Sequence, residues 1–183
     1  SNWDTSNVTD MSYMFYNTKL FNQELNFDTS KVTNMKNMFH GANKFNQPVN
    51  FDTSNVTNME CMFAYAEKFN QPLNQWNTSN VISMKAMFYG TKNFNQDLNN
   101  WNVSNVTNMD FMFDKALAFE NKYNSGRSLP NYTNEIKDWL NDNRDRMNAI
   151  DIKDQHGEDI DDFFSNITDI YSTNRIGLHE NLL

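Results

Sequence analysis

The sequence is short of cysteine, glycine and long apolar runs, and each shortage excludes a class of protein. Its 183 residues include a single cysteine, Cys61, so no disulfide can form within the chain. Only five glycines occur and no two are spaced Gly-x-Gly, which excludes a glycine-rich phosphate-binding loop. No apolar run approaches the roughly 18 residues of a membrane span, and the first residues lack the features of a signal peptide. We therefore expect no direct membrane insertion, and we expect any export signal or anchor to lie outside these residues.

Basic residues are also scarce. The chain has 15 Lys and Arg against 23 Asp and Glu, a net charge of −8 at pH 7. Residues 1–124 hold 11 acidic and 9 basic side chains (−2), whereas residues 125–183 hold 12 and 6 (−6). A protein with a pI near 4.7 has no positive surface for nucleic acid and is repelled by anionic membranes. We expect neither partner.

The main feature of the sequence is a motif that is repeated along the first two thirds of the chain. Five copies begin at an aromatic residue, at steps of 24, 24, 25 and 25 residues: Trp3, Phe27, Phe51, Trp76 and Trp101. Periods of this length are typical of stacked repeats. Burying about seven apolar side chains yields roughly 15 kcal/mol, whereas ordering one copy costs about 1.5 kcal/mol per residue. One copy therefore cannot fold alone, and we expect the copies to stack on one another.

Three apolar columns recur in every copy and should form stacked internal rows. They are Val8, Val32, Val56, Val81 and Val106; Met11, Met35, Met59, Met84 and Met109; and Phe15, Phe39, Phe63, Phe88 and Phe113. Within the first copy, the spacing from Met11 to Thr18 predicts about two turns of helix. Short strands are predicted at 25–27 and 32–33, joined by an Asp-Thr-Ser turn. The repeated Asn-Gln pairs at 22–23, 46–47, 70–71 and 95–96 are interpreted as an amide ladder that satisfies loop backbone.

The motifs resemble a known family. The element Asp-Thr-Ser-Asn-Val-Thr-Asn-Met at 52–59, followed by Met-Phe and Phe-Asn-Gln, is similar to the BspA-like bacterial surface-protein repeat of the leucine-rich-repeat family. The resemblance covers residues 3–124. It implies an α/β repeat solenoid, a right-handed stack of short strands and short helices. It also implies display on the bacterial cell surface, roles in adhesion, and no enzymatic activity.

Residues 125–183 depart from the repeat and are predicted to form an α-helical C-terminal cap or a separate partner-binding module. Ser125–Pro130 indicates a break between the two parts. A helix is predicted after Thr133, and a more clearly amphipathic one spans Ile160–Tyr171. At the other end, the edge at Trp3 has no cap in the sequence. Either the chain begins inside a longer array, which we favour, or a partner covers this edge.

The sequence offers only weak candidates for a catalytic or metal-binding site. The histidines His40, His156 and His179 lack zinc-ligand spacing, so we expect no metal and no cofactor. The acidic run at 151–162 does not follow the order of a calcium-binding loop. The column Asp4, Asp28, Asp52, Asn77 and Asn102 could attract a cation, but exposed turn-capping side chains are the favoured interpretation. Cys61 shares a column with unrelated residues and has no predicted catalytic role.

Two neighbouring columns vary freely between copies and are predicted to face water. They are Tyr16, His40, Ala64, Tyr89 and Asp114, and Asn17, Gly41, Tyr65, Gly90 and Lys115. Tyr16, His40, Tyr65 and Tyr89 would then form an exposed aromatic ridge suited to an extended peptide or a short glycan. The alternative is that these rings only shield the flank of the stack.

Two functions remain open on the sequence. One is a surface module for adhesion that binds a host or neighbouring protein or a glycan. The other is a structural spacer or terminal cap within a larger assembly. An enzymatic role would require an effector domain in residues 125–183, and no residue there supports it.

Overall fold

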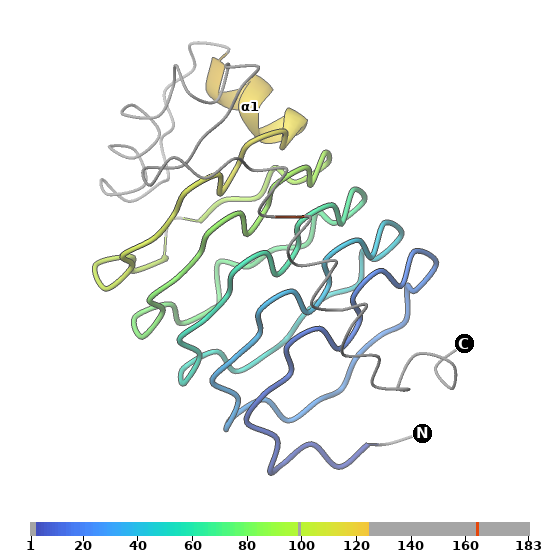
Figure 1. The fold of residues 1–183 in the computed structure, drawn as a ribbon, viewed down its shortest axis with the longest axis vertical. Helices are drawn as coiled ribbons and strands as arrows, with labels where there is room; N and C mark the ends of the chain where they lie inside the picture. The colour runs from blue at the N-terminus through green and yellow to red at the C-terminus, as the bar shows by residue number, and fades with distance from the viewer. Residues whose placement is uncertain (1–2, 99, 125–163, 165–183) are drawn as a thin grey trace. The chain divides into compact units, whose positions relative to one another are not determined.

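The computed structural model describes residues 3–98, residues 100–124 and Phe164. The five repeats form five coils that lie one on the next in chain order (Figure 1). The helix α1, Leu117–Asn124, follows the turns of the fifth coil. The chain divides into two compact units, Ser1–Met147 and Asn148–Leu183, and the coils belong to the first. The helices predicted after Thr133 and at 160–171 lie outside the described residues, apart from Phe164 itself.

No helix in the described part of the chain is long and apolar enough to cross a membrane.

Backbone hydrogen bonds join each coil to the next. Isolated parallel bridges connect one position of every copy: Asp10 to Asn34, Asn34 to Asn58, Asn58 to Ser83, and Ser83 to Asn108. From there, alternate N–H groups donate to carbonyls of the following coil. The first coil shows the pattern, with N···O distances of 2.9 Å from Met11 to Asn34, 3.0 Å from Tyr13 to Lys36 and 2.8 Å from Phe15 to Met38. The intervening N–H groups bond locally, as Tyr16 does to the carbonyl of Tyr13 at 3.1 Å.

The predicted short helix at 11–18 is wrong, since these residues form consecutive turns. Each copy places two residues four apart in the left-handed region, where an α-helix cannot continue. The first of each pair is Tyr13, Asn37, Cys61, Ala86 or Phe111, with φ between 53° and 61°. The second is Asn17, Gly41, Tyr65, Gly90 or Lys115, with φ between 56° and 69°. The apolar spacing that indicated a helix therefore arises from turns that return the same face to the core.

The predicted strands are also absent from the described residues as continuous elements. Residues 25–27 carry no strand assignment, and pairing near 32–33 is limited to the single bridge at Asn34. The coil is held by bonds at alternate positions rather than by an extended ladder.

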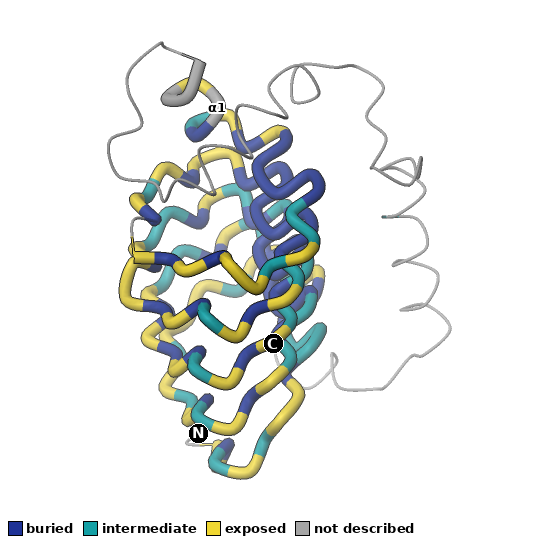
Figure 2. The backbone as a smooth tube through the Cα atoms, turned by 90° about the vertical axis from the view of Figure 1, so that its left-hand side faces the viewer, coloured by how far each residue is buried: buried dark blue, intermediate teal, exposed yellow. Residues whose placement is uncertain are grey.

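The core is a set of stacked side-chain columns, as the sequence predicts. Val32, Met35, Met38 and Phe39 are each 0% exposed. In the phenylalanine column, successive ring centroids are 5.4, 5.5, 5.9 and 5.6 Å apart, and the rings are nearly parallel. Buried segments of successive coils lie above one another along one side of the stack (Figure 2). The predicted stacking of the Val, Met and Phe columns as internal rows is confirmed for the phenylalanines, whose rings stack from each coil to the next.

The predicted amide ladder is confirmed too. The Oδ1 atom of each ladder asparagine accepts the backbone N–H of the asparagine in the next coil at 2.9 Å, from Asn46 to Asn22, Asn70 to Asn46, and Asn95 to Asn70. The Nε2 atom of the following glutamine donates to the backbone carbonyl of the same acceptor asparagine, at 3.0 Å for Gln71 and Asn46. Each Asn-Gln pair therefore closes two hydrogen bonds that the loop backbone needs.

The Asp-Thr-Ser segments form the predicted turns. In the second copy, the Asp28 carboxylate accepts hydrogen bonds from the backbone N–H of Ser30 at 3.0 Å and from its hydroxyl at 2.6 Å. The Thr29 hydroxyl donates to the carbonyl of Asp52 in the next coil at 3.0 Å. The turn is therefore closed by its own first residue and tied to its neighbour by its second.

We predict that Phe63→Ala lowers the free energy of unfolding by about 3–5 kcal/mol, because it leaves a cavity in the middle of the phenylalanine column. The Phe63 ring lies 5.5 Å from that of Phe39 and 5.9 Å from that of Phe88. Phe15→Ala is the matched control and should cost less, because that column continues on one side of Phe15 only. Urea denaturation of both variants measures the difference. Equal losses would contradict a core whose stability comes from stacking on both sides.

Candidate functional site

The structure contradicts the exposed aromatic ridge predicted at Tyr16, His40, Tyr65 and Tyr89. Tyr16, His40 and Tyr89 are 2%, 7% and 0% exposed, and Tyr65 is half-buried. Their ring centroids follow one another at 4.9, 5.7 and 5.3 Å. The four side chains therefore form a packed aromatic column, and Ala64 and Asp114 in the same repeat position are buried as well. Residues that are covered in this way contribute packing rather than an accessible recognition surface.

The second variable column owes its composition to the backbone. All five of its positions are left-handed, which explains two glycines and an asparagine among them. Space adds a further restriction, because a Cβ atom on Gly90 would lie 2.9 Å from Cδ1 of Tyr65. A Cβ atom on Gly41 would collide with the side chain of Asn17. Asn17 and Lys115 are exposed as predicted, whereas Gly41 and Gly90 are buried and Tyr65 is half-buried. The residue types in this column therefore follow the left-handed backbone and the local space as well as exposure.

Two side chains that could in principle act as an acid–base group or a nucleophile are buried in the described coils. His40 Nδ1 lies 3.0 Å from Asn37 Oδ1, and burial lowers the pKa of His40 to about 4. Burial raises the pKa of the Cys61 thiol well above its usual value, so the reactive thiolate is disfavoured. Neither side chain is placed or charged for acid–base or nucleophilic work at neutral pH.

The acidic column consists of turn-capping side chains in the described coils. Asp4 and Asp28 are exposed, and the hydroxyl and backbone N–H of the serine two residues on lower the pKa of each carboxyl group. Within residues 3–98 and 100–124, no group of three or more His, Cys, Asp or Glu side chains could hold a metal ion. The acidic run at 151–162 lies outside the described residues.

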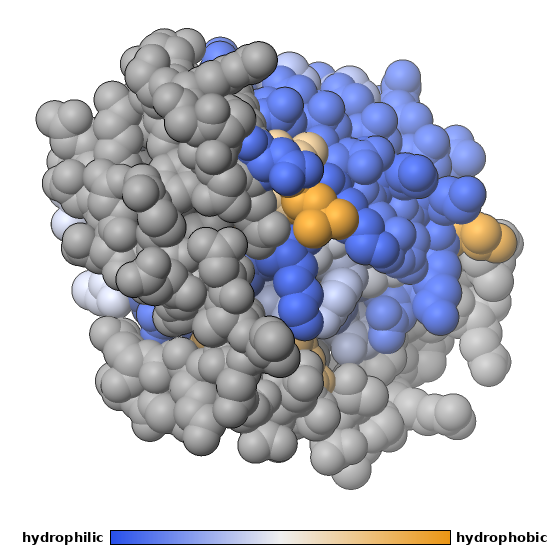
Figure 3. Space-filling model, turned by 90° about the horizontal axis from the view of Figure 1, so that it is seen from above, coloured by the Kyte–Doolittle hydropathy of each residue, from blue (hydrophilic) through white to orange (hydrophobic). Residues whose placement is uncertain are grey.

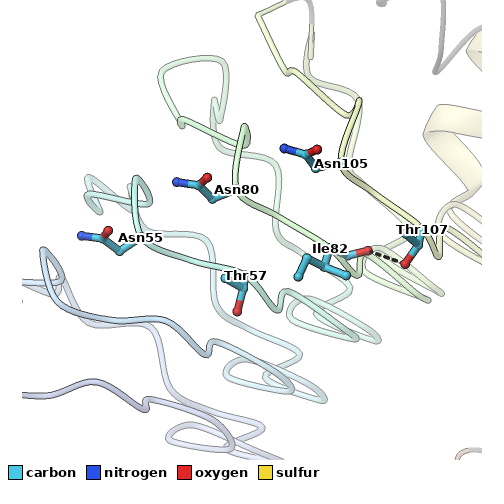
Figure 4. A pocket seen from close by; sticks show the side chains of 6 residues that line it. All are labelled: Asn55, Thr57, Asn80, Ile82, Asn105 and Thr107. Atoms are coloured by element: carbon cyan, nitrogen blue, oxygen red, sulfur yellow. Dashed lines mark hydrogen bonds between the residues drawn. The ribbon is translucent and has the colours of Figure 1, made fainter.

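An open groove of about 590 Å³ crosses the third, fourth and fifth coils, and we call it the amide groove. Two rows of side chains line it, one of asparagines and one of threonine and isoleucine: Asn55, Asn80, Asn105, Thr57, Ile82 and Thr107. The three asparagines point the same way from equivalent positions of successive coils (Figure 4). All six residues are exposed.

Hydrogen bonds hold both rows of the amide groove in place. The Nδ2 atom of each asparagine donates to a serine carbonyl of the preceding coil at 2.7 Å: Asn55 to Ser30, Asn80 to Ser54, and Asn105 to Ser79. The Thr107 hydroxyl donates to the carbonyl of Ile82 at 3.3 Å (Figure 4). No described residue donates to the three asparagine Oδ1 atoms. The amide groove therefore presents a preorganised row of acceptors.

Ile82, which lines the amide groove, differs from the residues at the same position in the other copies. It is 51% exposed, and it occupies a position where the other four copies have Thr9, Thr33, Thr57 and Thr107. Seen from the end of the stack that bears α1, the described surface is mainly hydrophilic, with small hydrophobic patches (Figure 3). The sequence reasoning missed this site because it treated the asparagine and threonine positions as parts of the repeat. The single exchange of threonine for isoleucine was the available signal.

One comparison with known proteins gives a match. A family model described as "Mycoplasma protein of unknown function, DUF285" matches residues 1–51 and 49–138. No curated protein and no solved structure matches the chain.

We predict that His40 makes the protein sensitive to mild acid. The folded-state pKa of about 4 lies below the usual histidine pKa of 6.5, so the unfolded chain binds the proton first. Stability is then fully present above pH 6.5 and falls by about 3 kcal/mol as the pH drops to 4. The pKa values of Asp4 and Asp28 are also lowered, so their contributions are lost in the same direction, as the pH falls below the usual aspartate value of 3.8.

The test is urea denaturation of the wild type and His40→Phe between pH 7 and 4. Phe keeps a ring in the aromatic column but does not titrate, and all other ionisable groups are common to both proteins. The wild type should lose stability more steeply than the variant between pH 6.5 and 4. Parallel pH profiles would contradict a buried, neutral His40.

Proposed function

The chain belongs to the DUF285 family, and from the amide groove we propose that it is a non-enzymatic binding module. We propose further that the five coils form a leucine-rich-repeat-like, right-handed solenoid of the BspA-like type, displayed on a bacterial cell surface for adhesion. Its ligand in this proposal is a host or neighbouring protein or a glycan. The observation that carries it is the row of exposed asparagine side chains beside Ile82, whose Oδ1 atoms accept no hydrogen bond from the described residues.

The chemistry of the amide groove favours an extended ligand with hydrogen-bond donors. Asn55, Asn80 and Asn105 each use one Nδ2 hydrogen within the stack, which leaves the Oδ1 atom and the second N–H available to a ligand. Peptide N–H groups and sugar hydroxyls are the donors that match such a row. Because each asparagine is already anchored to the preceding coil, binding orders few side chains, which keeps the entropic cost low.

Ile82 supplies the apolar contact that an amide row lacks. An apolar side chain 51% exposed at the centre of a polar groove gives a ligand a place to bury surface. Since hydrogen bonds exchanged with water contribute modestly, this apolar contact would provide much of the affinity and the amides the alignment.

A structural spacer is the second candidate function, and one feature of the coils favours it. The Asx turns and the amide ladder, which occupy much of each copy, serve the stack itself. A protein made chiefly of such positions needs no ligand to justify its repeats.

We predict that Asn80→Ala combined with Ile82→Ser reduces adhesion of protein-coated beads to cultured host cells or extracellular matrix. A loss of about tenfold in binding corresponds to about 1.4 kcal/mol, a moderate interface contribution. Both residues are exposed, and the loss of the Asn80–Ser54 hydrogen bond should lower the melting temperature only slightly. A glycan array probed with the same two proteins separates a sugar ligand from a protein ligand.

Leu117→Ser is the matched control, because Leu117 is 49% exposed, close to the value for Ile82, and lies outside the amide groove. It should leave adhesion unchanged. Equal adhesion of the double variant and the wild type would remove the amide groove as the site. Absence of adhesion by the wild type to cells, matrix and glycans would favour the spacer.

A further inference from the structure

The amide groove has a fixed repeat along the stack, and backbone hydrogen bonds set it. The N–H group of Ile82 donates to the carbonyl of Thr57 at 2.8 Å, and that of Thr107 donates to the carbonyl of Ile82 at 2.9 Å. Segments joined in this way lie about 4.8 Å apart. Each asparagine of the groove reaches the preceding coil at the same Nδ2···O distance of 2.7 Å, so the asparagine row follows the same repeat.

The asparagine row of the groove has a defined length of three coils. Its members are Asn55, Asn80 and Asn105, which point the same way (Figure 4). In the second copy this position holds Lys31, whose Nζ atom donates to Asn7 Oδ1 at 2.8 Å. The amide of Asn7 is therefore engaged by a lysine, and the row of equivalent amides begins at Asn55.

The lining of the amide groove carries no charge. All six lining side chains are asparagine, threonine or isoleucine. In the nearby turns, Asp28 and Asp52 of the second and third copies are replaced by Asn77 and Asn102 in the fourth and fifth. A charged ligand would lose hydration here without gaining an opposite charge from the lining, so the groove favours a neutral ligand.

An extended peptide does not match the repeat of the groove. Its N–H groups on one side recur at roughly 6.7 Å, so it falls about 2 Å further out of step at each coil. A polyproline II helix repeats at about 9.3 Å and meets only every second asparagine. A peptide cannot join the groove as an added strand either, because the backbone N–H groups of Ile82 and Thr107 are already paired within the stack.

We propose that the ligand of the amide groove is a neutral glycan of 1,4-linked pyranoses with equatorial linkages, lying along the stack with one ring per coil. This inference rests on the proposed binding function and names its ligand class. Such a ring is about as long as one coil spacing, and it carries hydroxyl groups along both edges, so each ring meets one asparagine. A hydroxyl donates and accepts, which matches an amide with an Oδ1 acceptor and one remaining N–H donor.

Ile82 supports the middle ring of the three. The C–H faces of an all-equatorial pyranose are apolar, and Ile82 is 51% exposed in the central coil of the groove. Both flanking threonines use their hydroxyl hydrogens within the stack, as Thr57 does toward the carbonyl of Thr33 at 3.2 Å. The groove therefore offers one apolar contact at its centre and an amide at every ring.

The test is a titration of the full, ¹⁵N-labelled chain with oligosaccharides of one to six rings, followed by NMR. Cello- and chito-oligosaccharides have the proposed linkage and differ only in the group at C2. Malto-oligosaccharides contain the glucose of the cello series with an axial linkage and are the matched control. Affinity for at least one of the first two series should rise about fivefold per ring up to three, the factor for one net hydrogen bond, and then level off. Maltohexaose should bind at least tenfold more weakly.

Ile82→Thr is the most conservative variant, because four other copies have threonine at this position and the fold should tolerate it. It should weaken binding of the three-ring oligosaccharide about fivefold, since it removes the apolar contact. Thr9→Ile makes the reverse exchange in the first coil, outside the groove, and should leave the affinity unchanged. Unchanged melting temperatures check that both variants are folded.

Four results would overturn the glycan ligand. They are no binding of either equatorially linked series, equal binding of maltohexaose, affinity that keeps rising beyond three rings, and equal binding by Ile82→Thr. Bead adhesion that the Asn80→Ala, Ile82→Ser variant loses but that cellohexaose and chitohexaose do not inhibit shows a protein ligand, so the proposed binding function stands and the glycan does not. Adhesion that this double variant retains contradicts the proposed site itself.

Discussion

The structure depends on the way each coil divides its backbone N–H groups between itself and its neighbour. At 11–18 the N–H groups of Met11, Tyr13 and Phe15 point to the next coil, while those between them close local turns. Left-handed residues four apart make this alternation possible, since a continuous right-handed helix would direct every N–H group along its own axis. The stack is therefore held by bonds that no single copy can form.

This division also determines where the side chains go. Because equivalent turns of successive coils lie directly above one another, each side chain contacts the residue at the same repeat position in the next coil. Phenylalanine therefore stacks on phenylalanine, with ring centroids 5.4 to 5.9 Å apart. The same registration aligns the amide ladder and the asparagines of the amide groove. One set of backbone bonds thus organises both the core and a polar surface.

Several features could be predicted from the sequence because they depend on repetition alone. The period, the buried Val, Met and Phe columns and the amide ladder follow from residues that recur in every copy, as at Phe39 and Asn46. The predicted helix at 11–18 is wrong because i, i+3, i+4 spacing indicates which side chains share an apolar face but does not reveal the sign of φ. At Tyr13 and Cys61 the side chain gives no hint of a left-handed backbone, a conformation that those residue types seldom adopt.

The candidate site illustrates the same limit. His40 and Tyr89 vary between copies, and variation was taken as a sign of exposure, yet both are buried and form part of an aromatic column. Asn80 and Asn105 look like repeat residues, yet they line the amide groove. The sequence by itself determined the repeat, the apolar columns and the acidic charge, because these depend only on which residues recur and how often. The tertiary structure alone decided which side chains of the variable columns and of the amide groove face water, because exposure depends on what the neighbouring coils cover, and no local pattern encodes that.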